Sequence, residues 1–278
     1  MNTTVEMALG EASRRLKRYS ESPSSDAQLL LGEALNRPRA WILSHPESEL
    51  RSDQAAEFEA SVNSVLNGAA LPYVLGWWEF FGRRFILEPQ VLIPRPETEL
   101  MVEEALGRSS SMPRILDLGT GSGCIAVTLA LELPQSCVYA SDMSWEALRI
   151  ARRNAIAHGV DRSVTFVHAD LAGVFEGPFD LVCANLPYIA TSQLPALAVA
   201  NREPIAALDG GSHGTQLIHQ ALEELPRILA AGGCALFEID PDQAGSVLER
   251  AKTSFPSATL SIATDLARRD RLLIIERA

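Results

Sequence analysis

The sequence has few of the residues that mark disulfide-rich or metal-binding proteins. It has only four cysteines among 278 residues, and none of them forms a C-x-x-C pair. Zinc sites and disulfide frameworks usually depend on closely spaced cysteines, and the five histidines also lack metal-ligand spacing. We therefore expect no metal and no disulfide. The apolar neighbours of the cysteines predict small buried side chains at Cys124, Cys137, Cys183 and Cys234.

Long apolar segments are also missing. No run approaches the ~20 consecutive apolar residues that a transmembrane helix requires. Residues 1–20 mix charged and apolar side chains, whereas a secretory signal peptide contains a continuous apolar stretch. We therefore expect no membrane association and a cytoplasmic location.

Positive charge is scarce. The chain has 24 Lys and Arg against 35 Asp and Glu, a formal net charge of −11. Proteins that grip naked RNA or DNA usually carry a basic surface, so the charge disfavours direct nucleic-acid binding without excluding a local basic patch. Hydrophobic residues make up 47% of the chain, which is enough to bury a sizeable core.

The first 72 residues show helical periodicity. Apolar residues recur at Val5, Ala8, Leu9, Ala12 and Leu16, the spacing of one helix face. No catalytic constellation occurs in this region. We interpret residues 1–72 as a small helical domain for substrate recognition, with simple packing as the alternative.

Residues 73–97 change in character and are predicted to form a β-hairpin connector. Residues 73–76 and 85–87 are short apolar runs typical of strands, and Gly82 lies between them. Pro94 and Pro96 then restrict the path into the next helix.

From residue 98 to 278, strand-like runs alternate with helical patterns, which indicates βαβ units on a parallel sheet. The last two strands are too close in sequence for an intervening helix, so they must pair antiparallel. The fold class is α/β. Expected strands span 115–118, 137–141, 164–168, 181–184, 235–239, 258–262 and 271–275, and expected helices lie near 97–107, 124–133, 144–158 and 214–231.

A glycine-rich turn follows the first of these strands and predicts a nucleoside site. It comprises Asp117, Leu118, Gly119, Thr120, Gly121, Ser122 and Gly123. Glycines allow a tight turn and a close approach of the backbone to a ligand, and the turn opens a helix whose N–H groups face that ligand. The spacing is G-x-G-x-G, which differs from the dinucleotide fingerprint G-x-G-x-x-G.

Acidic residues end the next two strands at the same edge of the sheet. Asp142 can accept hydrogen bonds from two ribose hydroxyls, and Asp170, which Leu171 follows, can accept one from an adenine amine. Each feature alone is a weak signal, because dehydrogenases also bind adenosine cofactors. Their order along the chain favours a nucleoside cofactor.

The fourth strand runs into Asn185-Leu186-Pro187-Tyr188, which we predict to be the catalytic motif. The Asn185 side-chain oxygen and the Leu186 carbonyl can accept the two N–H groups of an NH₂ and so orient its nitrogen for attack. Pro187 favours extended backbone at residue 186, and Tyr188 can pack against a planar target. The alternative is a chemically idle turn after a strand.

This motif is similar to the (N/D)-P-P-(Y/F) sequence of amide- and amine-directed methyltransferases. Over nearly its full length the chain resembles the release factor glutamine methyltransferase family (HemK/PrmC), on the motif above and on residues 73–82, 91–99, 117–123, 203–211 and 265–271. The resemblance implies a Rossmann-like class I S-adenosylmethionine (SAM) methyltransferase sheet with an antiparallel C-terminal hairpin. It also implies SAM as cofactor, and as substrate the Gly-Gly-Gln glutamine of class I peptide chain release factors. Asn185 would then contact the cofactor as well as the substrate.

Two departures from the family pattern stand out. Leu186 occupies a position where the family usually has proline, and residues 238–243, which include Asp240 and Pro241, lack the usual Gly-aromatic pair. Asn-Leu-Pro-Tyr also resembles the motif of ribosomal RNA adenine dimethylases, so an adenine N6-methyltransferase of RNA or DNA is the alternative function. A non-catalytic SAM-binding module is a further alternative, which the intact Asn185 and Pro187 disfavour.

Overall fold

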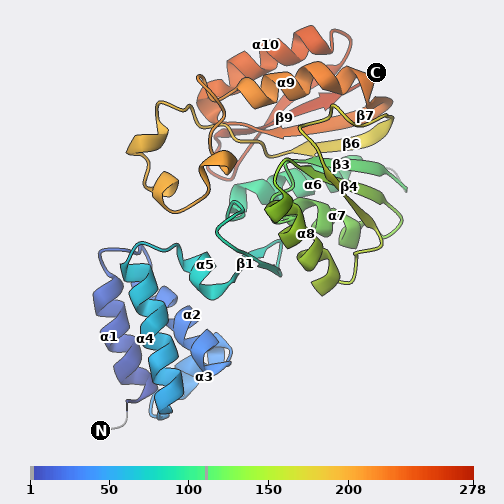
Figure 1. The fold of residues 1–278 in the computed structure, drawn as a ribbon. Coiled ribbons are helices and arrows are strands. Elements are labelled where there is room, and N and C mark those ends of the chain that lie inside the picture. Colours follow the sequence, from blue (N-terminus) through green and yellow to red (C-terminus); the bar gives the residue numbers. More distant parts are fainter. Residues whose placement is uncertain (1–2, 110–111) are drawn as a thin grey trace. The chain divides into compact units, whose positions relative to one another are not determined.

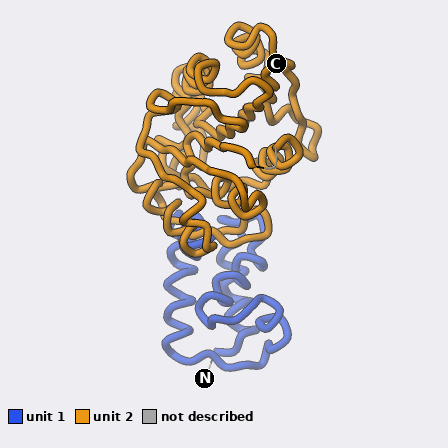
Figure 2. The backbone as a smooth tube through the Cα atoms, turned by 90° about the vertical axis from the view of Figure 1, so that its right-hand side faces the viewer, with its two compact units in different colours: residues 1–77 blue, residues 78–278 orange. Residues whose placement is uncertain are grey.

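The computed structural model describes residues 3–109 and 112–278. Contacts within the chain divide it into two units, Met1–Trp77 and Trp78–Ala278, which Figure 2 colours separately. Each unit has its own hydrophobic core.

The first unit is helical, as predicted. Thr4 is the N-cap of the first helix: its hydroxyl oxygen accepts a hydrogen bond from the backbone N–H of Met7 at 3.4 Å. Asn36 ends the second helix in the left-handed conformation, with φ of 49°. The helices are α1 (Val5–Leu16), α2 (Pro23–Leu35), α3 (Arg39–Ser44), α4 (Ser52–Leu66) and α5 (Leu71–Leu75). Their apolar faces meet in one core that includes Leu16, Leu31 and Val62.

The predicted strand at residues 73–76 is wrong, because this segment belongs to α5. Pro72 lies in the first turn of that helix, where its missing N–H is not needed, and Gly76 ends the helix with φ of +76°. A run of three apolar residues does not distinguish a strand from a helix by periodicity. The hairpin exists further along, between β1 (Trp77–Phe80) and β2 (Arg83–Ile86), with positive φ at both turn residues, Phe81 and Gly82.

The second unit is built on a sheet in which, within the described residues, seven strands pair in the order β5-β4-β3-β6-β7-β9-β8 (Figure 1). The first five strands of that order run parallel, whereas β9 pairs antiparallel with both β7 and β8. The α/β fold class with its C-terminal antiparallel hairpin is therefore confirmed. The strands are β3 (Arg114–Leu118), β4 (Cys137–Asp142), β5 (Val164–His168), β6 (Phe179–Ala184), β7 (Leu229–Glu238), β8 (Thr259–Thr264) and β9 (Asp270–Glu276).

Helices cover both faces of this sheet (Figure 1). One face packs on α6 (Glu99–Arg108), α7 (Cys124–Glu132) and α8 (Trp145–Ala157). The other packs on α9 (Gln216–Glu224) and α10 (Ala244–Ser254). Alternate residues of the central strands enter the two cores, as Ile115 and Leu116 do in β3, so these strands are buried on both sides. Short 3₁₀ helices are η1 (Pro96–Thr98), η2 (Leu194–Ala196), η3 (Ala198–Asn201), η4 (Ile205–Ala207), η5 (Leu225–Arg227) and η6 (Pro241–Gln243).

The cysteines follow the prediction with one exception. Cys124, Cys183 and Cys234 are buried, but Cys137 is exposed. Cys137 is the first residue of β4, so it precedes the part of the strand that both helical layers cover. Among the described residues, none of the helices has the length and apolar character needed to cross a membrane.

Candidate active site

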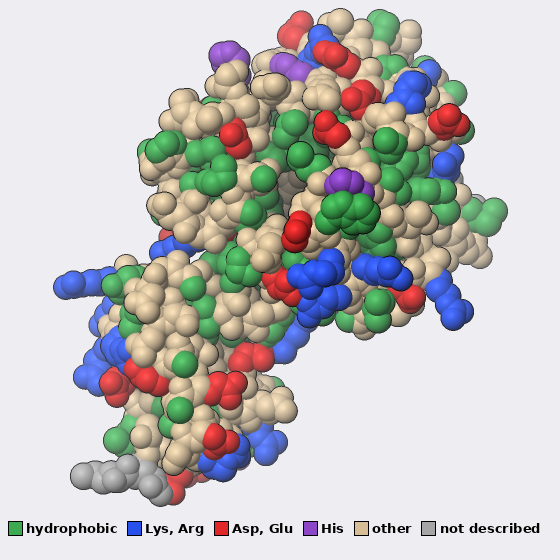
Figure 3. Space-filling view, in the orientation of Figure 1, with side chains coloured by type: hydrophobic (Ala, Val, Ile, Leu, Met, Phe, Trp, Pro, Cys, Tyr) green, Lys and Arg blue, Asp and Glu red, His purple; other side chains and the backbone are tan. Residues whose placement is uncertain are grey.

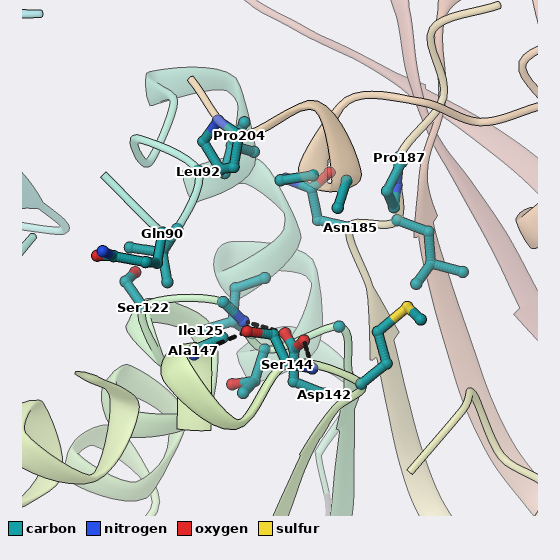
Figure 4. A pocket seen from close by; sticks show the side chains of 18 of the residues that line it. Gln90, Leu92, Ser122, Ile125, Asp142, Ser144, Ala147, Asn185, Pro187 and Pro204 are labelled. Carbon is teal, nitrogen blue, oxygen red and sulfur yellow. Dashed lines mark hydrogen bonds between the residues drawn. The ribbon is translucent and has the colours of Figure 1, made fainter. Parts of the chain in front are cut away.

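A cavity lies at the carboxyl ends of β3, β4 and β6, neighbouring strands of the sheet (Figure 4). Together with its open mouth it encloses about 1090 Å³. Asp142 and Ser144 lie on one side of it, and Asn185 and Pro187 lie opposite. The carboxyl edge of an open parallel sheet is where such folds bind ligands, so the cavity is the candidate active site.

Most of the predicted site residues line this cavity. They are Gly119, Thr120, Gly121, Ser122, Asp142, Asp170, Leu171, Asn185, Leu186 and Pro187. The structure gives three others different surroundings. Asp117 is fully buried beneath the glycine turn, Gly123 packs on α8, and Tyr188 lines a second cavity.

The glycine turn requires its glycines for two separate reasons. Gly119, Gly121 and Gly123 have φ of +68°, +55° and +80°, values that side chains disfavour. In addition, a Cβ on Gly123 would lie 2.9 Å from the Cβ of Ala151, so only glycine lets α7 approach α8 this closely. The turn therefore presents backbone to the cavity.

Asp117 braces the glycine turn from below. Its Oδ2 accepts hydrogen bonds from the Thr120 hydroxyl at 2.6 Å and from the Ala126 N–H at 3.2 Å. Burial raises the pKa of this carboxyl to about 7. Its Oδ1 is buried without a hydrogen-bond partner among the described residues. Asp117 therefore acts on the shape of the turn.

Asp142 joins the glycine turn to the end of β4. One carboxylate oxygen accepts from the Gly121 N–H at 2.9 Å, and the other accepts from the Ser144 N–H at 2.9 Å. Burial raises the pKa of Asp142 despite these bonds. Each carboxylate oxygen has a second lone pair, so Asp142 can still accept two hydroxyl groups from a ligand in the cavity.

The end of β5 completes this side of the cavity. The Ala169 N–H donates to the Asp142 carbonyl at 3.1 Å, which keeps the two strand ends together. Leu171 is buried and has φ of 46°, a backbone conformation that costs a non-glycine residue energy and that often occurs at ligand sites. Asp170 is exposed at the cavity rim.

The turn after β6 forms the opposite wall. The Asn185 side-chain nitrogen donates to the Thr98 hydroxyl at 3.0 Å. Leu186 is 3% exposed, and its Cδ2 lies 3.0 Å from where a Cβ on Gly119 would be. The leucine that replaces the expected proline therefore packs against the glycine turn.

Tyr188 does not line the first cavity. Its hydroxyl donates to Glu238 at 3.2 Å, and its ring lines a second cavity together with Leu92, Arg95 and Val199. Asn185, Leu186 and Pro187 line both cavities, so the predicted motif lies where the two meet.

Residues 238–243 have a structural role that sequence reasoning missed. The Gln243 side-chain nitrogen donates to the Tyr188 carbonyl at 2.7 Å, so η6 braces the turn after β6. Asp240 caps η6 by accepting from the Asp242 N–H at 2.9 Å. The charged residues at the end of β7 mark this segment as unusual in the sequence. The sequence does not show, however, that Gln243 contacts Tyr188.

Thr98, Gln90, Leu92 and Pro204 are further cavity residues that the sequence did not single out. Leu92 and Thr98 lie within block 91–99 of the resemblance, Gln90 precedes that block, and Pro204 lies within block 203–211, but the resemblance gave none of them a role. One ion pair connects those segments: Glu203 accepts from the Arg95 side chain at 2.5 Å and from the Ile93 N–H at 3.0 Å. Among the described residues, no cluster of three metal-ligating side chains was found.

Comparison with known protein families identifies both units. Residues 7–76 match the PrmC N-terminal domain, and residues 97–202 match the methyltransferase small domain. The chain is 38% identical to a release factor glutamine methyltransferase of Chlorobaculum tepidum, over 90% of this chain and 89% of the relative. It is also 38% identical to one of Moorella thermoacetica, over 99% of each chain.

Solved structures support the fold. A methyltransferase from Pyrococcus furiosus superposes with a TM-score of 0.56, covering 79% of this chain and 98% of that one. Its sequence is 19% identical to this one, so the likeness concerns the architecture alone.

Proposed function

The chain belongs to the release factor glutamine methyltransferase family, and from this premise we propose that it transfers a methyl group from SAM to the side-chain amide of a glutamine in a class I peptide chain release factor. The observation that carries the proposal is the position of residues 185–187 at the junction of two cavities. One cavity suits a nucleoside cofactor, and the other leaves room for a substrate side chain. Translation takes place in the cytoplasm, which is where we expect the enzyme to act.

The residues of the first cavity fit SAM. Asp142 offers two carboxylate oxygens to the ribose hydroxyls, and Gly119 and Gly121 offer backbone without side chains to the methionine part. Asp170 is the candidate acceptor for the adenine amine, and Leu171 the candidate apolar contact for the ring. When bound there, SAM supplies a methyl group on a positively charged sulfur.

Asn185 and Leu186 orient the attacking nitrogen. The Asn185 Oδ1 accepts one N–H of the substrate amide, and the Leu186 carbonyl accepts the other. Two acceptors on one NH₂ point the nitrogen lone pair at the methyl carbon, which is catalysis by orientation and electrostatics. Pro187 favours extended backbone at Leu186 and so directs that carbonyl.

The proton balance needs no strong base in the site. Methyl transfer would leave one surplus proton on the amide nitrogen. The Asn185 Oδ1 would hold that proton by a hydrogen bond until it is released to solvent. Tyr188 is the candidate surface for the planar amide, because it lines the second cavity next to this turn.

We further propose that the helical domain, residues 1–72, recognises the release factor, and that residues 73–97 are its connector to the methyltransferase domain at 98–278. The helical domain has its own core, and the cavity residues come from position 90 onward. Its match to the PrmC N-terminal domain supports the same assignment. On the face shown in Figure 3 acidic and basic side chains are intermixed, as suits a protein partner better than a nucleic acid.

The test is incubation with methyl-labelled SAM and separate substrates. We expect label in a release factor, on the glutamine of its Gly-Gly-Gln sequence, as located by peptide mass spectrometry. A release factor with that glutamine replaced by alanine is the matched control. Label in ribosomal RNA or DNA adenine, with none in the release factor, would support the adenine N6-methyltransferase alternative.

A further inference from the structure

A chain of three hydrogen bonds runs behind the catalytic turn. The Asn185 side-chain nitrogen donates to the Thr98 hydroxyl at 3.0 Å, and that hydroxyl donates to Glu238 Oε2 at 2.6 Å. The Tyr188 hydroxyl donates to the other oxygen, Glu238 Oε1, at 3.2 Å. Thr98 and Glu238 are each 2% exposed, so water has little access to compete for these bonds.

The direction of this chain follows from the chemistry of its members. Both hydroxyls give their single hydrogen to a Glu238 oxygen, Thr98 to Oε2 and Tyr188 to Oε1. The Thr98 oxygen then has only lone pairs left for Asn185. Only the NH₂ end of the Asn185 amide can meet it, and the Oδ1 end must face the other way, toward the cavity.

We infer that Glu238 and Thr98 are positioning residues that fix the orientation of the Asn185 amide and thereby present its oxygen to the substrate. The inference rests on the proposed function, since it explains how Asn185 accepts the N–H of a substrate amide. An amide has nearly the same shape in either orientation, so the turn alone does not select one. The buried Glu238 carboxyl selects the orientation of the Asn185 amide through Thr98, which lies between them.

Neighbouring charges act on Glu238 from several elements. Burial has the largest influence and raises the pKa of the Glu238 carboxyl. The hydrogen bonds from Thr98 and Tyr188 and the positive charge of Arg271, on β9, lower this pKa, and Glu97, on η1, raises it. Arg271 is 9% exposed and also donates to Asp265 at 3.3 Å. The two hydroxyl donors and Arg271 oppose this effect of burial, and the two hydroxyls that donate to Glu238 set the direction of the hydrogen-bond chain.

Glu238→Gln keeps the size and shape of the side chain but no longer fixes the direction of the hydrogen bonds through Thr98. A glutamine amide can donate to the Thr98 oxygen, which frees the Thr98 hydrogen to donate to Asn185. The Asn185 amide then turns around and presents its NH₂ to the N–H of the substrate. Thr98→Val has a related effect, because it leaves the Asn185 NH₂ without its partner.

The kinetic test uses single-turnover methylation of a release factor with both substrates saturating. We expect Thr98→Val and Glu238→Gln to slow the methyl-transfer step by roughly 10- to 100-fold, with SAM affinity and release-factor KM changed by no more than roughly 3-fold. Thr98→Ser keeps the hydroxyl and should recover most of the rate. A Thr98→Val enzyme that binds SAM and turns over at the wild-type rate would overturn the inference, as would a Thr98→Ser enzyme as slow as Thr98→Val.

Thr128→Val is the matched control for the loss of a buried threonine hydroxyl. Thr128 is fully buried in α7, and its hydroxyl has no hydrogen-bond partner among the described residues. We expect this variant to keep the wild-type rate. An equal slowing in Thr128→Val and Thr98→Val would assign the effect to general packing and contradict a positioning role.

A spectroscopic test separates this inference from the proposed function. In protein labelled with ¹⁵N-asparagine, the Asn185 NH₂ signal is identified by its loss in Asn185→Asp. We expect a nuclear Overhauser effect from that NH₂ to the Thr98 methyl group, and its loss in Glu238→Gln. Persistence of the signal in Glu238→Gln would overturn the role of Glu238. If the wild-type enzyme transferred no methyl group to a release factor, the proposed function would fail while this measurement still decided the amide orientation.

Discussion

Asn185 and Thr98, 87 positions apart in the chain, meet through a hydrogen bond of 3.0 Å at the wall of the cavity. The contact joins the turn after β6 to the start of α6. This contact uses the nitrogen of the Asn185 amide, so the oxygen is the end of the amide left to bind a substrate.

Asn185→Ala should nearly abolish methyl transfer while leaving SAM binding largely intact. The variant removes an acceptor that orients the attacking nitrogen, and losing one such preorganised group costs roughly 10²–10³-fold in rate. Single-turnover kinetics with saturating SAM, together with calorimetric SAM titration, measure both quantities. Full activity in the variant would exclude Asn185 from the chemistry.

Leu186→Pro should keep the rate within a few-fold of wild type but lower the free energy of unfolding. The backbone carbonyl is retained, whereas the buried packing against Gly119 is reduced. We expect a loss of about 1–2 kcal/mol, smaller than the ~2–5 kcal/mol typical of a buried Leu→Ala change. Urea unfolding and single-turnover rates for Leu186→Pro and Leu186→Ala provide the comparison. If Leu186→Pro were folded yet as slow as Asn185→Ala, the leucine side chain itself would contact the substrate.

Asp142→Ala should weaken SAM binding strongly. Each charge-assisted hydrogen bond to a ribose hydroxyl contributes on the order of 1.5–3 kcal/mol, and the carboxylate also holds the Gly121 N–H. Calorimetric titration measures the change in affinity. Asp161→Ala, an exposed position before the amino end of β5, is the control and should bind SAM normally. Unchanged affinity in Asp142→Ala would mean that the ribose lies elsewhere.

Asp117→Asn should flatten the dependence of stability on pH between about 4 and 7. Burial raises the pKa of Asp117 to about 7 from its ordinary 3.8, so in this window the folded chain binds a proton that the unfolded chain releases. The stability contributed by this proton is fully present below pH 3.8 and is lost as pH rises toward 7, by at most about 1.4 kcal/mol per pH unit. Asparagine keeps an acceptor for Thr120 without titrating. Urea unfolding of both proteins across this range measures the difference, and parallel curves would assign the titration to other groups.

A chain beginning at Trp77 should fold and bind SAM but methylate the release factor poorly. The second unit contains both cores around the sheet and all the cavity residues named above. Circular dichroism and calorimetric titration verify folding and SAM binding, and methylation at several release-factor concentrations measures KM. Methylation at the full rate and unchanged KM would show that the helical unit is not a recognition module.

The strands of the sheet could be predicted because their residues carry the information locally. Fully buried strands such as β3 and β6 appear as short apolar runs, and the glycine turn between β3 and α7 needs glycine at positions of positive φ. The segment at 73–76 was mistaken for a strand because three apolar residues fit either period, and only the packing of α5 on the first core selects the helix.

The sequence alone determined the fold class, the family and the residues at the carboxyl ends of the strands, since each of these follows from local pattern or from order along the chain. The tertiary structure decided which distant residues meet there. Thr98, Glu238 and Gln243 approach the turn at Asn185 because η1, the end of β7 and η6 converge on it, and no local pattern encodes such a contact. The direction of this hydrogen-bond chain depends on which oxygens at its buried end accept, so it arises only when folding brings the Glu238 carboxyl and its two hydroxyl donors together.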